Sequence, residues 1–373
     1  MKQESNPIFE ENSTNSREPG ESIAPLGYLP LTGTRPRMEG ENRARPGFLS
    51  QLVEDFLGAE KSQKEPVLVA VEGHEILVDE TSKPLQLNAS MIKAEVLRHW
   101  VAEPQRQADV IFIGRTREGS AVLALTGNWE YFCDFKTEHL NLLGPDGEQR
   151  PPRDVLASHA EGHWQSVHEL AEHVANSQDA ELKIWLELAG AAVALNNWHR
   201  GAAYDPATGQ ETVVAQAGWS RVNSAGREIF PRTDPAVITA VTATFDGEER
   251  ILLGQARAWG KNRFSTFAGF IEASESAENA VQRELLEECN GEVDSLQYLG
   301  SQPWPFPRSL MLGYRAEISN PHQVQADGEE IETVRWFTAH ELKTAHSSGE
   351  IKLPSRASIS RMLIENFLGE PLA

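Results

Sequence analysis

The sequence predicts an α/β protein of two domains that are joined by a connector. The chain has 373 residues, of which 40% are hydrophobic, so it exceeds one typical domain and can fill two cores. Runs of apolar and β-branched residues, bounded by turn residues, alternate with stretches of helical spacing along most of the chain. No internal repeat at a solenoid period is present in the sequence, so we expect two ordinary globular units.

Residues 1 to 45 are rich in Pro, Gly, Glu, Ser and Asn and contain few large apolar residues. Such a segment cannot bury enough surface to offset its ordering entropy, so we expect a flexible N-terminal extension. Residues 60 to 196 predict a strand-rich N-terminal domain whose C-terminal part, from residue 157, is helical. Its strands are expected at residues 67–71, 75–78, 110–113 and 121–125.

Residues 197 to 232 form a connector rich in Gly and Ala, and residues 233 to 373 predict a second domain. The first two strands of this domain, residues 236–245 and 250–256, flank Asp246-Gly247, which is a hairpin signal. An acidic helix follows them. We then expect strands near residues 296–299 and 310–316, a strand that ends at Trp336-Phe337, and helices near residues 339–344 and 358–367.

The acidic helix carries the clearest functional pattern of the chain, the run Arg283-Glu284-Leu285-Leu286-Glu287-Glu288. Because Glu284, Glu287 and Glu288 are three and four residues apart, their carboxylates project from neighbouring parts of one helix face. Without cations these groups would repel one another and resist ionising together. Hard oxygen ligands of this kind suit Mg²⁺ or Mn²⁺, so we predict that the three glutamates bind such a metal and act in catalysis.

Residues 269 to 288 read GFIEASESAENAVQRELLEE, which resembles the Nudix box: a glycine, a glutamate six residues later, and Arg-Glu-apolar-x-Glu-Glu. The resemblance ends after the glutamates, where Asn290 and Gly291 replace the usual glycine and apolar residue. A merely solvated acidic helix is the competing interpretation, but it leaves the glycine, the outlying glutamate and the arginine to chance. The resemblance implies a C-terminal α/β/α sandwich with a mixed sheet, and we assign Gly269 to a turn out of the preceding strand.

A second motif, residues 301 to 309, reads SQPWPFPRS and closely resembles the array that marks the NADH pyrophosphatase (NAD⁺ diphosphatase) branch of Nudix hydrolases. Three prolines stiffen this loop, and its aromatic rings offer flat apolar faces. The alternative from residue chemistry alone is a rigid turn that packs against the domain core. The substrate-binding residues that we predict here are Gln302, Pro303, Trp304, Pro305, Phe306, Pro307, Arg308 and Ser309.

The resemblance also implies roles for residues outside the two motifs. It implies that Phe270 stacks on the nicotinamide ring and that Phe230 is supplied by the other subunit of a homodimer. The Ala268 carbonyl and Glu330 correspond to metal ligands of the family, although the glutamate before Glu330 offers a second register. Ser360 falls where the family has a small residue that contacts substrate.

Many members of the family carry a four-cysteine zinc ribbon between their domains, in the region that matches residues 199–226. This chain has two cysteines, Cys133 and Cys289, and neither lies in that region. A tetrahedral zinc site therefore lacks its ligands, and we predict no structural zinc. We expect a degenerate zinc ribbon that is held by packing around Trp219, with His199 as a structural polar residue.

These patterns together predict metal-dependent hydrolysis of the diphosphate in NADH or NAD⁺, which gives NMNH or NMN plus AMP. Which glutamate acts as general base stays open, with Glu287 a reasonable candidate. The nearest alternatives keep the chemistry and change the substrate to ADP-ribose or to the NAD cap of RNA. Two further alternatives are a catalytically silent NAD-binding regulator and an adaptor that acts through residues 1 to 45.

The net charge of −21 argues against a broad electrostatic grip on nucleic acid or on acidic membranes. The N-terminus lacks the basic and apolar regions of a signal peptide, and the longest apolar stretch, near residues 186–195, is too short to span a bilayer. We therefore expect a cytoplasmic protein with a small-molecule dinucleotide substrate and no membrane partner.

Overall fold

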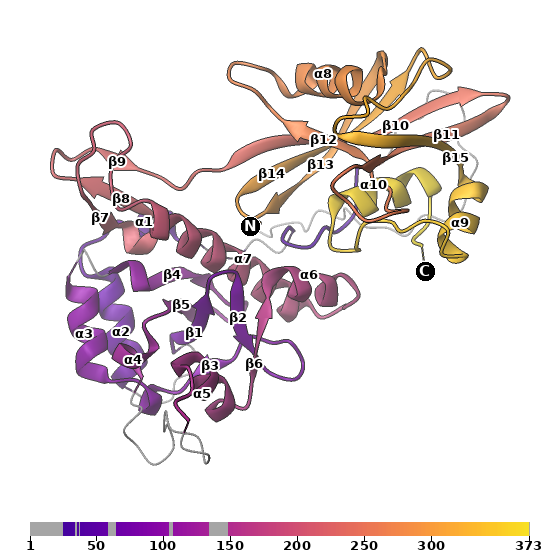
Figure 1. The fold of residues 1–373 in the computed structure, drawn as a ribbon. Coiled ribbons are helices and arrows are strands. Elements are labelled where there is room, and N and C mark those ends of the chain that lie inside the picture. Colours follow the sequence, from indigo (N-terminus) through magenta and orange to yellow (C-terminus); the bar gives the residue numbers. More distant parts are fainter. Residues whose placement is uncertain are drawn as a thin grey trace, which may run out of the picture.

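A computed structural model of the chain describes residues 25–33, 36, 38–58, 65–103, 107–133 and 148–372. These residues form an N-terminal α/β domain, a three-stranded connector and a C-terminal α/β domain, in that order along the chain (Figure 1). The predicted α/β fold class is confirmed. In the described ranges, no helix combines the length and the apolar character that crossing a membrane requires.

The N-terminal domain is built on a six-stranded sheet with the order β4-β5-β1-β2-β6, in which β3 also pairs with β1. β1 and β5 run parallel, and the other pairs are antiparallel. The strands are β1 (Val67–Glu72), β2 (Glu75–Val78), β3 (Gln86–Leu87), β4 (Val110–Arg115), β5 (Ala121–Thr126) and β6 (His163–Ser166). The helices are α1 (Gly40–Arg43), α2 (Phe48–Gly58), α3 (Ala94–Ala102), α4 (Trp129–Phe132), α5 (Pro152–His159), α6 (Val167–Ala175) and α7 (Ala180–Gly201).

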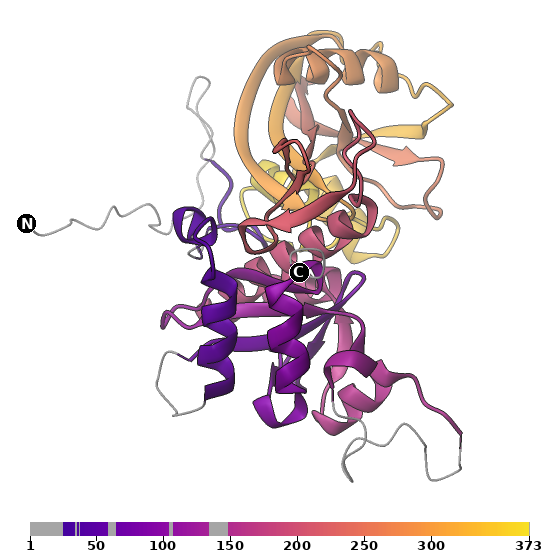
Figure 2. The same cartoon turned by 90° about the vertical axis from the view of Figure 1, so that its left-hand side faces the viewer.

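Successive residues of β1 enter two different cores, because a strand directs its side chains alternately to opposite faces. Leu68 and Ala70 share a core with residues of α2 and α3, whereas Val69 and Val71 share a core with residues of α6 and α7. Helices therefore cover both faces of the sheet (Figures 1 and 2). The sequence predicts strands followed by helices in this domain. The structure differs in two respects: helices α2 and α3 are additional, and strand β6 lies beyond residue 157.

The expectation of a flexible extension over residues 1 to 45 is wrong for its described part. Residues 25–33, which we call the strap, join the two domains: Leu29 packs in the core of the C-terminal domain and Leu31 in that of the N-terminal domain. These leucines are 3% and 6% exposed, and the Leu26 N–H donates to the Leu299 carbonyl (3.0 Å). A few apolar residues in a polar segment therefore order the strap, while residues 1–24 lie outside the described residues.

The connector is an antiparallel sheet of β7 (Thr212–Ala215), β8 (Ser220–Asn223) and β9 (Glu228–Ile229). Its turns meet at Asp205, which has no exposed surface. The Asp205 carboxylate accepts hydrogen bonds from the Ala207 N–H (2.9 Å), the Asn223 amide (2.9 Å) and the Thr208 hydroxyl (3.1 Å). These bonds, of which the one from the Ala207 backbone has the largest effect, hold the pKa of Asp205 below its ordinary value. The ionised carboxylate therefore links the turns of the connector through its hydrogen bonds.

Trp219 and His199 fasten the connector to its surroundings. The Trp219 indole N–H donates to the Phe112 carbonyl (2.6 Å), which agrees with the expected anchoring role. His199 is buried, with Nε2 at 2.7 Å from the Gly218 carbonyl and Nδ1 at 3.2 Å from a guanidinium nitrogen of Arg221. Burial, and then the charge of Arg221, lower the pKa of His199 to about 4, so it is a neutral structural residue at neutral pH.

The C-terminal domain has a second six-stranded mixed sheet, with the order β13-β14-β10-β11-β15 and with β12 also paired to β10. β10 and β14 run parallel, and the other pairs are antiparallel. The strands are β10 (Asp234–Phe245), β11 (Glu248–Ala256), β12 (Phe267–Phe270), β13 (Val293–Trp304), β14 (Ser309–Ile318) and β15 (Ile331–Thr338). The helices are α8 (Ala277–Cys289), α9 (Ala339–Ser347) and α10 (Ile359–Leu368).

The central strand β10 divides this domain into two cores. Val237 and Val241 pack with residues of α8, whereas Ile238 and Ala240 pack with residues of α9 and α10. Figure 1 shows α8 on one side of the sheet and α9 and α10 on the other. The predicted α/β/α sandwich with a mixed sheet is confirmed, and α8 alone occupies one face of it among the described helices.

Candidate active site

Helix α8, which carries the acidic residues, is fixed at both ends. The Ser276 hydroxyl accepts a hydrogen bond from the Asn279 N–H (3.2 Å) and so caps the first turn. Asn290 ends the helix in the left-handed conformation, with φ at 54°, which asparagine tolerates better than most residues. Asn290 therefore fulfils the conformational requirement of the glycine that usually stands here, and the rotation of the helix is set by its buried residues Val281 and Leu285.

Gly269 lies inside β12 and not at a turn, so the expected reason for this glycine is wrong. A Cβ atom on Gly269 would overlap with the carboxylate of Glu284. Any side chain at this position would displace that carboxylate. The glycine is required because α8 places Glu284 directly against β12.

Arg283 holds three acidic side chains in place. Its Nε and Nη2 donate to the two carboxylate oxygens of Glu275 (2.8 and 2.9 Å), and its Nη1 donates to Glu284 (2.8 Å) and Glu287 (3.1 Å). Nη2 also donates to the Phe270 carbonyl (2.9 Å), which ties α8 to β12. The bonds from Arg283 lower the pKa of Glu275 to about 2, so Glu275 stays ionised and braces the arginine.

Glu288 is the buried carboxylate of this helix. It is 6% exposed, and its Oε2 has no hydrogen-bond partner. Burial, and then the charges of Glu284, Glu330 and Asp327, raise the pKa of Glu288 to about 8. A buried, unpartnered carboxylate oxygen among other carboxylates fits a ligand of a divalent cation.

Asp327 joins the cluster, although no motif of the sequence marks it. Its carboxylate accepts hydrogen bonds from the N–H groups of Glu330 (3.1 Å) and Ile331 (2.8 Å), and its own N–H donates to the Glu288 carbonyl (3.3 Å). Asp327 thus fixes the loop that brings Glu330 to the end of α8. Glu330, and not Glu329, is among the charges that raise the pKa of Glu288, which favours the expected register.

In the described part of the chain, no three His, Cys, Asp or Glu side chains form a ready-made metal site. One physical reason is that Arg283 binds the carboxylates of Glu284 and Glu287. The donor set still fits Mg²⁺ or Mn²⁺, because all the side-chain donors are carboxylates and Glu288 has a free buried oxygen. Glu284, Glu287, Glu288 and Glu330 are therefore the side chains that would hold the cation.

A cavity of about 420 Å³ lies beside β12 and is lined by residues of both domains. Its apolar lining includes Ile238 and Met311. Three hydroxyls of its lining bond one another, with Ser360 Oγ at 2.7 Å from both Ser265 Oγ and Thr266 Oγ1. An apolar cavity with a few fixed polar groups is typical of a small-molecule site.

The structure brings four of the predicted site residues to this cavity, namely Ala268, Gln302, Trp304 and Ser360. Gln302 is fully buried: its amide donates to the carbonyls of Pro30 (3.0 Å) and Ala357 (2.7 Å), and its Oε1 accepts from the Ile359 N–H (2.8 Å). Because both N–H groups of Gln302 are bound within the protein, we correct its expected substrate contact to a positioning role.

The other residues of the second motif lie outside the cavity lining. Pro305 is buried, and Phe306 packs against the core of the N-terminal domain, so the alternative of a packing turn applies to these two. The Nε of Arg308 donates to Asp234 (2.7 Å), and the side chain is otherwise half exposed. Pro303 and Pro307 are exposed, and Ser309 begins β14.

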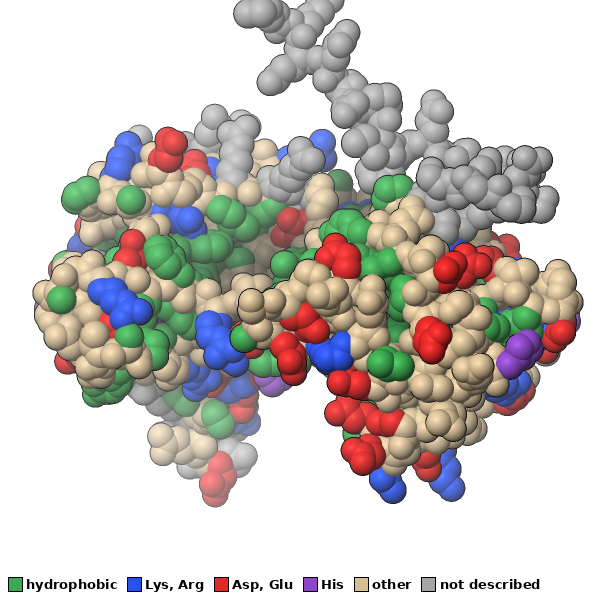
Figure 3. Space-filling model, turned by 90° about the horizontal axis from the view of Figure 1, so that it is seen from above, with side chains coloured by type: hydrophobic (Ala, Val, Ile, Leu, Met, Phe, Trp, Pro, Cys, Tyr) green, Lys and Arg blue, Asp and Glu red, His purple; other side chains and the backbone are tan. Residues whose placement is uncertain are grey.

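Phe230 and Phe270 are each 58% exposed. Both rings are therefore accessible to a ligand or to a partner subunit, as the roles that the resemblance implies require. The C-terminal domain, in the right-hand half of Figure 3, shows several groups of acidic side chains and few basic ones.

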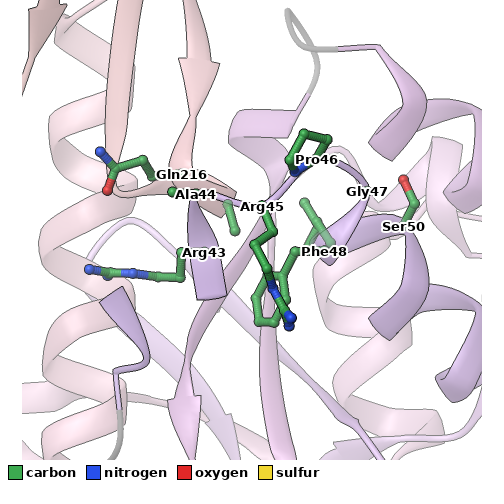
Figure 4. A pocket seen from close by; sticks show the side chains of 10 residues that line it. Arg43, Ala44, Arg45, Pro46, Gly47, Phe48, Ser50 and Gln216 are labelled. Atoms are coloured by element: carbon green, nitrogen blue, oxygen red, sulfur yellow. The ribbon is translucent and has the colours of Figure 1, made fainter. Parts of the chain in front are cut away.

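A second hollow, of about 190 Å³, lies at the start of α2 next to the connector (Figure 4). Arg43, Arg45 and Gln216 contribute to its lining. It contains none of the predicted site residues, whereas the cavity beside β12 contains four of them and is the candidate substrate site.

The sequence is similar to those of known proteins over much of its length. The NUDIX domain family matches residues 235–355. The "NAD-capped RNA hydrolase NudC" of Mycobacterium bovis is 43% identical over 190 residues, which are 48% of this chain and 60% of that protein. The protein of the same name from Pseudomonas putida is 32% identical over 272 residues, which are 67% of this chain and 93% of that protein. The NUDIX domain of Shewanella oneidensis NrtR, solved with ADP ribose, is 19% identical with a TM-score of 0.30, over 37% of this chain and 87% of that chain.

An α/β/α sandwich with this acidic helix, matched by the NUDIX family, is the domain of a Nudix hydrolase. Because the Pseudomonas putida relative is matched over almost its whole length, the chain belongs to the NADH pyrophosphatase (NudC) family of Nudix hydrolases. The match to the mycobacterial relative spans about 60% of that protein.

Proposed function

We propose that this protein hydrolyses the diphosphate linkage of NADH or NAD⁺ and releases NMNH or NMN plus AMP. The observation that carries the proposal is the arrangement around β12. The acidic helix packs against this strand at Gly269, and the adjacent residue, Ala268, lines a cavity that can take a nucleoside. The relatives are named for hydrolysis of NAD-capped RNA, and NAD contains this linkage.

Nudix hydrolases generally use divalent metals, and we propose Mg²⁺ or Mn²⁺ at Glu284, Glu287, Glu288 and Glu330 with the Ala268 carbonyl. Such a cation, when bound, would neutralise charge on the diphosphate and lower the pKa of a water molecule. Arg283 orients two of these carboxylates, and Glu275 orients the arginine. Glu287 is 60% exposed, so its carboxylate is accessible to accept a proton from the attacking water.

The remaining residues position the dinucleotide for this attack. Water adds to one phosphorus while the bond from that phosphorus to the bridging oxygen breaks, so two monophosphates leave. We propose that the cavity with Trp304 holds one nucleoside of the dinucleotide and that exposed Phe270 stacks on the nicotinamide ring. Exposed Phe230 supports the proposal of a homodimer in which this ring reaches the partner's site.

A second candidate is removal of the NAD cap from RNA, which the names of the relatives favour. The chemistry is the same. The net charge of −21 leaves little attraction for the RNA body, so we expect recognition to depend on the cap. For either substrate we propose a cytoplasmic location. We keep the predicted connector at residues 197–232 and second domain at residues 233–373, and we extend the first domain beyond the predicted 60–196 to include α2, which packs in its core.

A panel of substrates tests the proposal. The purified protein is given NADH, NAD⁺, ADP-ribose and NAD-capped RNA with Mg²⁺ or Mn²⁺, and the release of AMP or of the shortened RNA 5′ end is followed over time. We expect the highest kcat/KM for a nicotinamide-containing substrate. A clear preference for ADP-ribose, or no turnover of any member of the panel, contradicts the proposal.

A further inference from the structure

Residues 29 to 32 of the strap form a tight turn. The N–H (3.1 Å) and the hydroxyl (2.8 Å) of Thr32 both donate to the Leu29 carbonyl. Proline fixes a negative φ at Pro30, and Leu31 has a positive φ of 68°, which is the pattern of a type II turn. The first central residue of such a turn has a ψ of about +120°, which directs its carbonyl out of the turn. The strap therefore presents the Pro30 carbonyl to a neighbouring donor.

The N-terminal domain holds Leu31 in this conformation, which is uncommon for a residue other than glycine. The Leu31 side chain is 6% exposed and shares a core with residues of α6 and α7. It packs directly on Gly190 of α7, where an added Cβ atom would lie 2.7 Å from Leu31 Cδ2. Tyr28 makes a second contact with α7, because Lys183 Nζ lies 4.2 Å from the centroid of its ring. The turn is thus fastened to α7.

The Pro30 carbonyl is bound by Gln302 of β13, in the C-terminal domain. The amide group of Gln302 donates to the carbonyls of Pro30 (3.0 Å) and Ala357 (2.7 Å), and its Oε1 accepts from the Ile359 N–H (2.8 Å). Gln302 has no exposed surface, so water does not replace a bond that is lost here. One side chain therefore links the strap, β13 and the start of α10.

Two residues of the cavity lie next to these hydrogen bonds. Trp304 follows Gln302 by two residues on β13, and Ser360 follows Ile359 at the start of α10. Both line the cavity beside β12. The Trp304 ring also packs edge to face against His168 of α6, which lines the same cavity, with 5.4 Å between centroids. Because both domains contribute to the lining, the shape of the cavity depends on how the domains are held together.

The strap leucines belong to different cores from the acidic helix. Leu31 packs with α6 and α7, and Leu29 packs with α9 and α10. The buried residues of α8 form a separate core on the other face of the C-terminal sheet. A perturbed strap should therefore weaken substrate binding and leave the chemical step at α8 unchanged.

We propose that the strap is a positioning element of the substrate site, which acts through the bond from Gln302 to the Pro30 carbonyl and sets the placement of Trp304 and Ser360. A segment that precedes both domains in the chain thus determines how well the cavity binds its ligand. This inference rests on the proposed function, because it takes the cavity as the substrate site of that reaction.

Steady-state kinetics with NADH test the inference in the full-length protein. We expect Leu31→Ala to raise KM about five- to tenfold, the effect of one buried hydrogen bond, while kcat stays near the wild-type value. Leu31→Val is the milder variant: it keeps most of the apolar volume but places a β-branched residue at a positive φ, so it should also raise KM.

Leu97→Ala is the matched control. Leu97 is a buried leucine of α3, in the core on the other face of the N-terminal sheet. Its replacement should cost a comparable amount of stability and leave KM unchanged. A similar rise of KM in Leu97→Ala, or a wild-type KM in both Leu31 variants, overturns the inference.

A double-mutant cycle tests whether the strap acts through Gln302. Gln302→Leu removes the side-chain hydrogen bonds at similar volume and should raise KM at least as much as Leu31→Ala. Because Leu31→Ala then has no bond to Gln302 left to weaken, the double variant should have the KM of Gln302→Leu alone. Effects on KM that multiply in the double variant contradict the inference.

Hydrogen exchange gives a readout that does not depend on turnover. Ile359 is the first residue of α10, so its N–H has no acceptor within the helix and is protected by Gln302. We expect this amide to exchange at least about fivefold faster in Leu31→Ala than in Leu97→Ala. Equal rates in the two variants count against the positioning role.

The two readouts separate this inference from the proposed function. If the wild type hydrolyses no dinucleotide while the Ile359 amide exchanges faster in Leu31→Ala alone, the proposed function is wrong and the positioning role stands. If NADH is hydrolysed but Leu31→Ala matches Leu97→Ala in both KM and Ile359 exchange, the positioning role is wrong and the proposed function stands.

Discussion

Glu288 combines burial, an unpartnered oxygen and a pKa of about 8, and no other carboxylate of α8 does so. At neutral pH without metal, its carboxyl group is largely protonated and resembles the uncharged amide of glutamine. A cation would replace that proton. A substitution of Glu288 can therefore remove metal binding without lowering the stability of the fold.

We predict that Glu288→Gln lowers kcat by at least about 100-fold, because one metal ligand is lost. The melting temperature of the metal-free variant at pH 7 should equal or exceed that of the wild type, since glutamine adds no charge to the buried site. Turnover assays and thermal melts with and without Mg²⁺ or Mn²⁺ measure both effects. Glu278→Gln, at an exposed position of the same helix, is the control and should keep full activity; wild-type turnover in Glu288→Gln would refute the metal assignment.

His199 gives a prediction for pH. Its pKa is lowered in the folded protein to about 4 by burial, so below the ordinary value of about 6.5 the unfolded chain binds the additional proton. The stability that His199 contributes is complete above that value and is lost as the pH falls toward 4, with a slope of roughly 1 kcal/mol per pH unit. Denaturant titrations give the free energy of unfolding at pH 5 and at pH 7. The difference between these two values should be smaller for His199→Gln than for the wild type, and equal differences would contradict the prediction.

At the scale of elements, the connector shows how a ribbon without cysteines stays folded. The Asn223 amide donates to Asp205 (2.9 Å), and its Oδ1 accepts from the N–H groups of Ala225 and Arg227 (both 2.9 Å). Asn223 is 5% exposed, so these bonds are shielded from water. Hydrogen bonds thus perform here the organising role that four thiolates and a zinc ion perform in a zinc ribbon.

We predict that Asn223→Ala destabilises the protein by about 2–3 kcal/mol, because it leaves buried polar groups without partners. A zinc chelator should leave the melting temperature of the wild type, as purified, unchanged. The control Ser224→Ala, at an exposed neighbouring position, should change stability by less than about 0.5 kcal/mol. A large fall in the melting temperature on chelation would show that a bound metal stabilises the connector.

The acidic helix could be predicted from the sequence because helical periodicity alone sets the spacing of Glu284, Glu287 and Glu288. The hairpin at Asp246-Gly247 could be predicted for the same local reason, and both residues have positive φ, 54° and 80°. Asp327 and His168 could not, because each reaches the site through tertiary packing and neither belongs to a local motif. The reason for Gly269 also lies in tertiary structure, in the approach of another element to β12.

At the scale of the whole molecule, the two domains are joined by contacts that could not be predicted from local sequence patterns. The strap inserts Leu29 into one core and Leu31 into the other, and Gln302 bonds the strap through the Pro30 carbonyl. Phe306, from the second motif, packs against the N-terminal domain. The motif that identifies the family therefore also forms part of the domain interface.

We predict that Leu29→Ala and Leu31→Ala each cost about 2–4 kcal/mol, because each empties a buried site. The double variant should uncouple the domains, so that one unfolding transition becomes two in calorimetry. Leu286→Ala is the control, since Leu286 is 55% exposed and should have little effect. A single transition with unchanged midpoint in the double variant would show that the strap does not couple the domains.

The most direct test of the account is the analysis of products from NADH. The purified protein is incubated with NADH in the presence of Mg²⁺ or Mn²⁺, and the products are separated and quantified. We expect NMNH and AMP in equal amounts, with formation that stops when the metal is chelated and falls at least about 100-fold in Glu288→Gln. Release of nicotinamide, intact NADH after prolonged incubation, or equal turnover in Glu288→Gln would contradict it.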